Sequence, residues 1–144
     1  HLSINPLIPK PHTPFQWEAV PSIPYVRGSL NLLKKLLRGD RRFLVSCFDP
    51  RHAKIQAFLS LGDRKIGRVI EMAARYDGGL GGWRRALGEC NISIENYTQR
   101  KTIGEPMPWD HIDIGLNKGF HIKQVENARK MISVSEDGDQ QREA

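Results

Sequence analysis

The chain has 144 residues, of which 39% are hydrophobic and 26% charged, and its formal net charge is +6. This length is enough for one domain with a hydrophobic core. No apolar run reaches the roughly 18 residues that a membrane-spanning helix needs, so the sequence predicts no contact with a membrane. The two cysteines do not make a disulfide framework, and we expect Cys47 and Cys90 to be buried free thiols.

The chain begins with strand-like residues 2–5, followed by a proline-rich connector over residues 6–24. Closely spaced prolines fix φ and remove backbone donors, so neither a helix nor a central strand runs through this segment. A stiff loop that leaves a strand end often presents side chains to a ligand. The alternative is a structural linker whose aromatic residues fill a core. The residues that define this motif are Pro9, Pro11, Pro14, Phe15 and Trp17.

Residues 27–38 have the spacing of an amphipathic helix, which we expect to end at Gly39-Asp40. The apolar run over residues 43–48 has β character and predicts a strand. Asp49 followed by Pro50 is a good helix start, and this helix is expected to reach about Ser60.

The second half of the chain is predicted to be helical, with helices over residues 63–76 and 83–90 and another from Ser93 to about Arg100. The glycines over residues 78–82 predict a turn between helices. They are not a phosphate-binding loop, because no strand precedes them and no Lys-Ser/Thr pair follows. An irregular loop is expected over residues 101–116, a final helix from 117 or 118 to Met131, and a polar, frayed tail over 133–144.

The loop over residues 101–116 contains the best chemical groups of the second half. His111 and Asp113 are two residues apart, so in an extended stretch they project to one side. Such a pair can face a substrate or contribute to a metal site, but no further metal ligand lies at a typical spacing, and we assign none. The structural alternative is a folded clasp, in which Trp109 is buried and Asp110 caps backbone donors.

Two segments resemble a known family. Residues 5–17, Asn-Pro-Leu-Ile-Pro-Lys-Pro-His-Thr-Pro-Phe-Gln-Trp, resemble the stretch at the last barrel strand of radical S-adenosylmethionine (radical SAM) proteins that often carry an N-terminal cobalamin-binding-like domain. Residues 108–115, Pro-Trp-Asp-His-Ile-Asp-Ile-Gly, resemble a segment near the C-terminal end of the same proteins. Residues 30–39 and 62–67 also fit, so the resemblance covers about residues 2–121.

The resemblance implies an α+β, mostly helical chain in three parts. Residues 1–48 would be the terminal part of a radical SAM barrel, 49–132 a helical C-terminal extension, and 133–144 the polar tail. Radical SAM enzymes hold a four-iron cluster through Cys-x-x-x-Cys-x-x-Cys, which this sequence lacks. We therefore expect a C-terminal fragment that is inactive alone and holds no cofactor, whose partner is the rest of the parent chain.

The parent would be an iron–sulfur oxidoreductase-like enzyme of the reducing cytoplasm. Its cofactors would be a four-iron cluster and S-adenosylmethionine, and the resemblance leaves open whether it also uses cobalamin. The loop after the last strand would lie at the barrel mouth, where the chemistry meets substrate. The candidate substrate-binding residues are His12, Thr13, Gln16, His111 and Asp113.

The excess of basic residues offers a different hypothesis, a non-catalytic helical module that binds RNA or a protein partner. No recognised nucleic-acid motif accompanies them, and a solvated helix face explains most of them. The basic residues are Lys34, Lys35, Arg38, Arg41, Arg42, Arg51, Lys54, Arg64, Lys65, Arg68, Arg75, Arg84 and Arg85.

Overall fold

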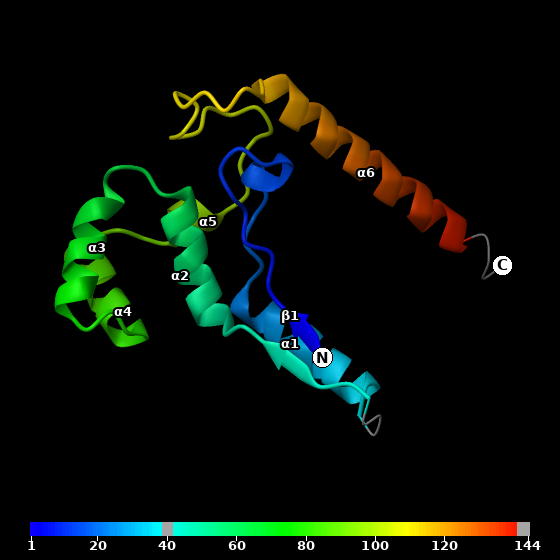
Figure 1. Ribbon diagram of the computed structural model, residues 1–144, viewed down its shortest axis with the longest axis horizontal. Helices are drawn as coiled ribbons and strands as arrows, with labels where there is room; N and C mark the ends of the chain where they lie inside the picture. Colours follow the sequence, from blue (N-terminus) through cyan, green and yellow to red (C-terminus); the bar gives the residue numbers. More distant parts are fainter. Residues whose placement is uncertain (39–41, 141–144) are drawn as a thin grey trace.

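A computed structural model describes residues 1–38 and 42–140, and the side chains as far as Met131. Within these residues the chain is mostly helical, with a short two-stranded sheet, which confirms the predicted α+β, mostly helical class (Figure 1). None of the helices in this part of the chain combines the length and the apolar character needed to cross a bilayer.

The N-terminal third is a β–α–β unit. Strand β1 (Leu2–Ile4) pairs in parallel with β2 (Val45–Cys47), and Leu2 lies opposite Val45. Parallel strands need a crossover connection, which here contains α1 (Ile23–Leu36). Both predicted strands are present. The helix begins earlier than expected because the Ser22 hydroxyl accepts a hydrogen bond from the N–H of Tyr25 at 3.3 Å. The predicted stop at Gly39-Asp40 lies outside the described residues.

The middle of the chain contains α2 (Pro50–Leu61), α3 (Ile66–Arg75) and α4 (Leu80–Glu89), followed by the short α5 (Glu95–Thr98). Asp49 caps α2 as predicted, accepting from the N–H of Arg51 at 2.9 Å. Helices α3 and α4 pack against each other and against α2. Their shared core includes Phe58, Ile66, Val69, Ala73 and Ala86.

The predicted glycine turn over residues 78–82 is too long. Gly78 has a φ of 64° and makes the turn, but α4 already begins at Leu80, so Gly81 and Gly82 are helical. A Cβ at position 82 would lie 2.3 Å from the carbonyl oxygen of Tyr76, so close packing explains this glycine.

The last helix, α6 (Lys118–Gln140), begins where predicted, because Asn117 accepts a hydrogen bond from the N–H of Phe120 at 2.9 Å. It continues past the predicted end at Met131. The prediction ended the helix too early because residues 133–144 are polar. Polar residues can continue a helix where no proline interrupts its backbone. Only residues 141–144 of the predicted tail lie outside the described residues.

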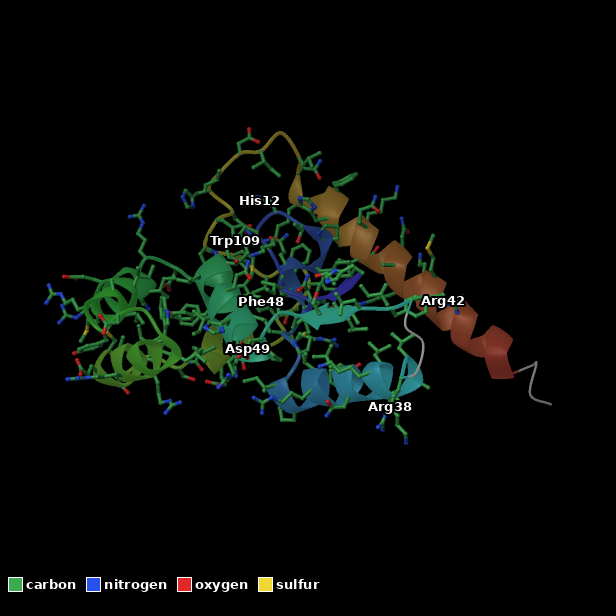
Figure 2. The ribbon with its side chains drawn as sticks, turned by 60° about the horizontal axis from the view of Figure 1, so that its bottom comes forward. His12, Arg38, Arg42, Phe48, Asp49 and Trp109 are labelled. Carbon is green, nitrogen blue, oxygen red and sulfur yellow. The ribbon has the colours of Figure 1, made fainter. Side chains whose placement is uncertain are left out.

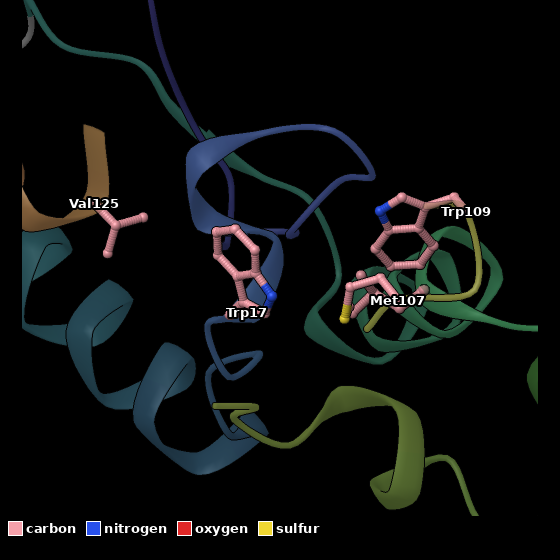
Figure 3. Packing of buried hydrophobic residues seen from close by; sticks show 5 residues of the cluster. Trp17, Met107, Trp109 and Val125 are labelled. Atoms are coloured by element: carbon pink, nitrogen blue, oxygen red, sulfur yellow. The ribbon is translucent and has the colours of Figure 1, made fainter. Parts of the chain in front are cut away.

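A second hydrophobic core joins segments that are far apart in the sequence. Trp17 comes from the proline-rich loop, and Met107 and Trp109 come from the loop before α6. Leu61 comes from α2 and Val125 from α6. Figure 3 shows the side chains of Trp17, Met107, Trp109 and Val125 gathered at this junction. The candidate functional residues lie around this core.

Candidate functional site

The proline-rich loop is folded by its own hydrogen bonds. Thr13 donates its hydroxyl to the carbonyl oxygen of Lys10 at 2.8 Å, and the short 3-10 helix η1 (Pro14–Trp17) follows. His12 has a φ of 54°, in the left-handed region, and its N–H donates to the side-chain oxygen of Gln16 at 3.3 Å. Gln16 therefore helps to hold His12 in a conformation that non-glycine residues seldom adopt.

The loop before α6 is folded by its aspartates. Asp110 accepts from the N–H of Met107 at 3.0 Å and from the ammonium of Lys118 at 2.6 Å. Asp113 accepts from the N–H of Gly115 at 2.8 Å, where the chain turns with a φ of 75°. The prediction that Asp110 caps backbone donors is thus confirmed, and both carboxylates already have partners.

One buried hydrogen bond joins the two loops. The indole N–H of Trp109 donates to the side-chain oxygen of Gln16 at 2.7 Å, and Trp109 and Gln16 are both buried. The same amide oxygen thus holds His12 and Trp109, which Figure 2 shows near the start of α6. The predicted burial of Trp109 is confirmed, and the side chain contacts the proline-rich loop through Gln16.

A pocket of about 290 Å³ lies between these loops and the first turn of α6. Four of the five candidate substrate-binding residues line it, namely His12, Gln16, His111 and Asp113. The fifth, Thr13, is not in the lining, and its hydroxyl bond to Lys10 makes it a structural residue of the loop. Lys118 and His121, both from α6, complete the side of the pocket that sequence reasoning missed.

His121 is the most unusual residue of this pocket. It is only 4% exposed, and neither of its ring nitrogens has a hydrogen-bond partner among the described residues. The Nε2 atom of His12 is also buried without a partner there. A sequence signal did exist, because His121 lies four positions before the buried Val125 and therefore on the same face of α6.

The Asp110–Lys118 ion pair lies in the lining of the pocket. Partial burial acts to raise the pKa of Asp110, but the hydrogen bonds from Lys118 and from the Met107 N–H outweigh it. The positive charge of Lys118 and the nearby His12 act in the same direction, so the net pKa of Asp110 is lowered. Asp110 is therefore ionised at neutral pH and neutralises Lys118.

A second, more apolar cavity of about 750 Å³ lies beyond Trp109. It is bounded by the turn between α2 and α3, over residues 62–65, and by the same loop before α6. His111 is exposed and borders both cavities. It does not pair with Asp113, whose carboxylate instead accepts a hydrogen bond from the N–H of Gly115. The predicted His111–Asp113 pair is therefore two separate groups.

The described residues do not fit a metal or an iron–sulfur cluster. They contain no group of three His, Cys, Asp or Glu side chains placed to hold a metal ion. Cys47 is in β2 and Cys90 follows α4, and both are free thiols. They are only partly buried, which corrects the expectation of buried thiols. The reason is position: Cys47 is in an edge strand, and Cys90 is at a helix end.

Several basic residues that suggested RNA binding are in ion pairs. Arg51 pairs with Asp49, Lys54 with Glu95, Arg75 with Glu71 and Arg85 with Glu89, at 2.6 to 2.9 Å. The guanidinium of Arg85 also lies over the ring of Tyr76, 4.2 Å from its centroid. These contacts favour the interpretation of a solvated face for this part of the basic set.

Comparison of the chain with protein-family models, with curated proteins and with solved structures finds no match.

Proposed function

We propose that this chain acts as the C-terminal part of a radical SAM enzyme, and that the pocket between its two loops contacts the substrate. One observation carries the proposal. The two segments that carry the family resemblance are far apart in the sequence, yet they are joined by the Gln16–Trp109 hydrogen bond and line one pocket. The residues we assign to substrate contact are His12, Gln16, His111 and Asp113.

The β–α–β unit supports the same proposal. Parallel strands joined by a helix are the repeating unit of α/β barrels, in which functional loops follow the carboxyl ends of the strands. The proline-rich loop follows the carboxyl end of β1 in this way. Large apolar side chains around the unit are exposed, which suits packing against further strands of a parent chain. They are Leu2, Leu7, Leu32, Leu36, Phe43 and Leu44.

The role of this chain in such an enzyme is to hold and orient substrate. Its described residues do not form a ligand set for a four-iron cluster, which takes three thiolates in this class, so we assign no step of the cluster's chemistry to them. Four ion pairs within the basic set lead us to favour this proposal over RNA binding.

The complete product of the gene that encodes this chain tests the proposal. Its reading frame should contain Cys-x-x-x-Cys-x-x-Cys before the codon for His1, and the protein reconstituted without oxygen should form 5′-deoxyadenosine. Substitution His111→Ala should lower substrate turnover and leave the cluster absorbance unchanged. The matched control is His52→Ala, on the exposed side of α2. A complete gene product without that motif or without a cluster would refute the proposal.

A further inference from the structure

The pocket between the loops contains three buried imidazole nitrogens that have no partner among the described residues. Two belong to His121 and one to His12. Buried polar atoms in folded proteins are nearly always hydrogen-bonded, because an unmade bond costs the full desolvation of the group. His121 lines the pocket, and only 4% of this residue is exposed. These nitrogens therefore have unmet hydrogen-bonding capacity beside the pocket.

The charges around the pocket favour neither a simple anion nor a simple cation. Asp110 and Lys118 neutralise each other. A free anion would then meet the carboxylate of Asp113, and a free cation would meet the positive end of the α6 dipole. No third His, Cys, Asp or Glu completes a metal site with the two histidines in the described part of the chain. The balance of these groups favours a neutral, polar ligand.

Hydroxyl groups match this lining. A neutral imidazole presents one N–H donor and one nitrogen acceptor, and a hydroxyl both accepts and donates. The other lining groups fit as well, since Asp113 accepts, Lys118 donates and Gln16 has an amide. The volume of about 290 Å³ is near the lower end of the usual range for ligand pockets, which begins at roughly 300 Å³.

We propose that this pocket binds a small, uncharged molecule with several hydroxyl groups, a polyol or a sugar. The inference rests on the proposed substrate role of the same pocket and names the class of that substrate. His12, whose left-handed conformation is held by Gln16, and His121, fixed on α6, supply the donors and acceptors that orient the hydroxyl groups.

The full 144-residue chain is titrated with ribose, with glycerol and, separately, with phosphate and acetate, while the ring signals of its five histidines are followed by NMR. The signals are assigned with single His→Gln variants. We expect ribose to give saturable shifts of the His12 and His121 rings, with a dissociation constant of the order of 1 mM. The ring of the exposed His52 is the internal control and should not shift.

The variant His121→Leu should bind ribose at least about tenfold more weakly, because it removes a donor and an acceptor. It should still fold, since Leu removes an unpartnered buried polar group. His121→Gln, which restores a donor and an acceptor, should recover part of the affinity, and His52→Leu should bind like the unmodified chain.

Three results would overturn the inference: no saturable shift with ribose or glycerol, equal shifts of all five histidines, or saturation by phosphate or acetate instead. Each concerns this chain alone, whereas the proposed enzymatic role is tested by cluster and 5′-deoxyadenosine formation in the complete gene product. Failure of one is therefore distinguishable from failure of the other.

Discussion

Replacement of Trp109 by alanine tests whether the two loops fold as one unit. The indole is 6% exposed and packs with Trp17, Met107, Leu61 and Val125. Truncating a buried tryptophan to alanine costs about 3–5 kcal/mol, through lost burial and the cavity left behind. In the variant, the Gln16 oxygen loses the indole N–H but still accepts a hydrogen bond from the His12 N–H at 3.3 Å. It is therefore not left unpaired, and the lost bond adds little to the cost. We therefore expect destabilisation of about 4 kcal/mol.

Urea unfolding of the full chain, followed by tryptophan fluorescence and circular dichroism, measures this cost. With a slope of about 2 kcal/mol/M, the midpoint should fall by about 2 M. Trp109→Phe keeps a ring but loses the N–H bond to Gln16, and should cost about 0.5–1.5 kcal/mol, because the Gln16 oxygen keeps its other bond.

The matched control is Ile112→Ala on the same loop. Its side chain is 52% exposed, and its substitution should change stability by no more than about 0.5 kcal/mol. If Trp109→Ala unfolds at the same urea concentration as Ile112→Ala, the two loops do not share a core and the reasoning is wrong.

Three other outcomes are expected. In thermal melts, Gly82→Ala should destabilise the chain by about 1–3 kcal/mol, because its Cβ would overlap the Tyr76 carbonyl. Gly81→Ala, whose Cβ would have no atom within 4 Å, should stabilise the chain by about 0.5–1 kcal/mol. Hydrogen bonds from Lys54, then from Ser93 and the backbone N–H, lower the pKa of Glu95 from 4.5 to about 2. Its contribution to stability is therefore present above pH 4.5 and is lost as the pH falls towards 2. Melts from pH 6 to 2 should show a weaker acid dependence for Glu95→Gln; equal curves would contradict this. Anaerobic reconstitution of the chain alone should give no stoichiometric cluster, since its two cysteines cannot replace three thiolates; iron and sulfide analysis checks this.

Local signals in the sequence were sufficient for many elements of the fold. Asp49-Pro50 predicts the start of α2 because a carboxylate cap and a proline act within one turn. The apolar run and β character of residues 43–48 predict β2 for the same local reason. The signals fail where packing decides. Position 82 has no room for a side chain because the Tyr76 carbonyl lies against it, which no local pattern reveals.

The candidate site was predicted in part. His12, Gln16, His111 and Asp113 were candidates because they are polar or titratable residues in two stiff loops. All four line the pocket. The opposite wall depends on how α6 docks on Trp17 through Val125, a contact between residues distant in the sequence. His121 was therefore missed. Thr13 lies outside the pocket lining, and its hydroxyl donates to the Lys10 carbonyl.

The amide of Gln16 has a consequence for the folding equilibrium. Because its oxygen holds both the His12 backbone and the Trp109 ring, the walls of the pocket exist only while the core beneath them is intact. A molecule that fills the pocket therefore binds the native chain and not the unfolded one, and mass action shifts the equilibrium towards folding. At a concentration of 100 times its dissociation constant, the ligand adds about 2.7 kcal/mol. A rise in melting temperature thus identifies ligands in a compound library before any reaction is known.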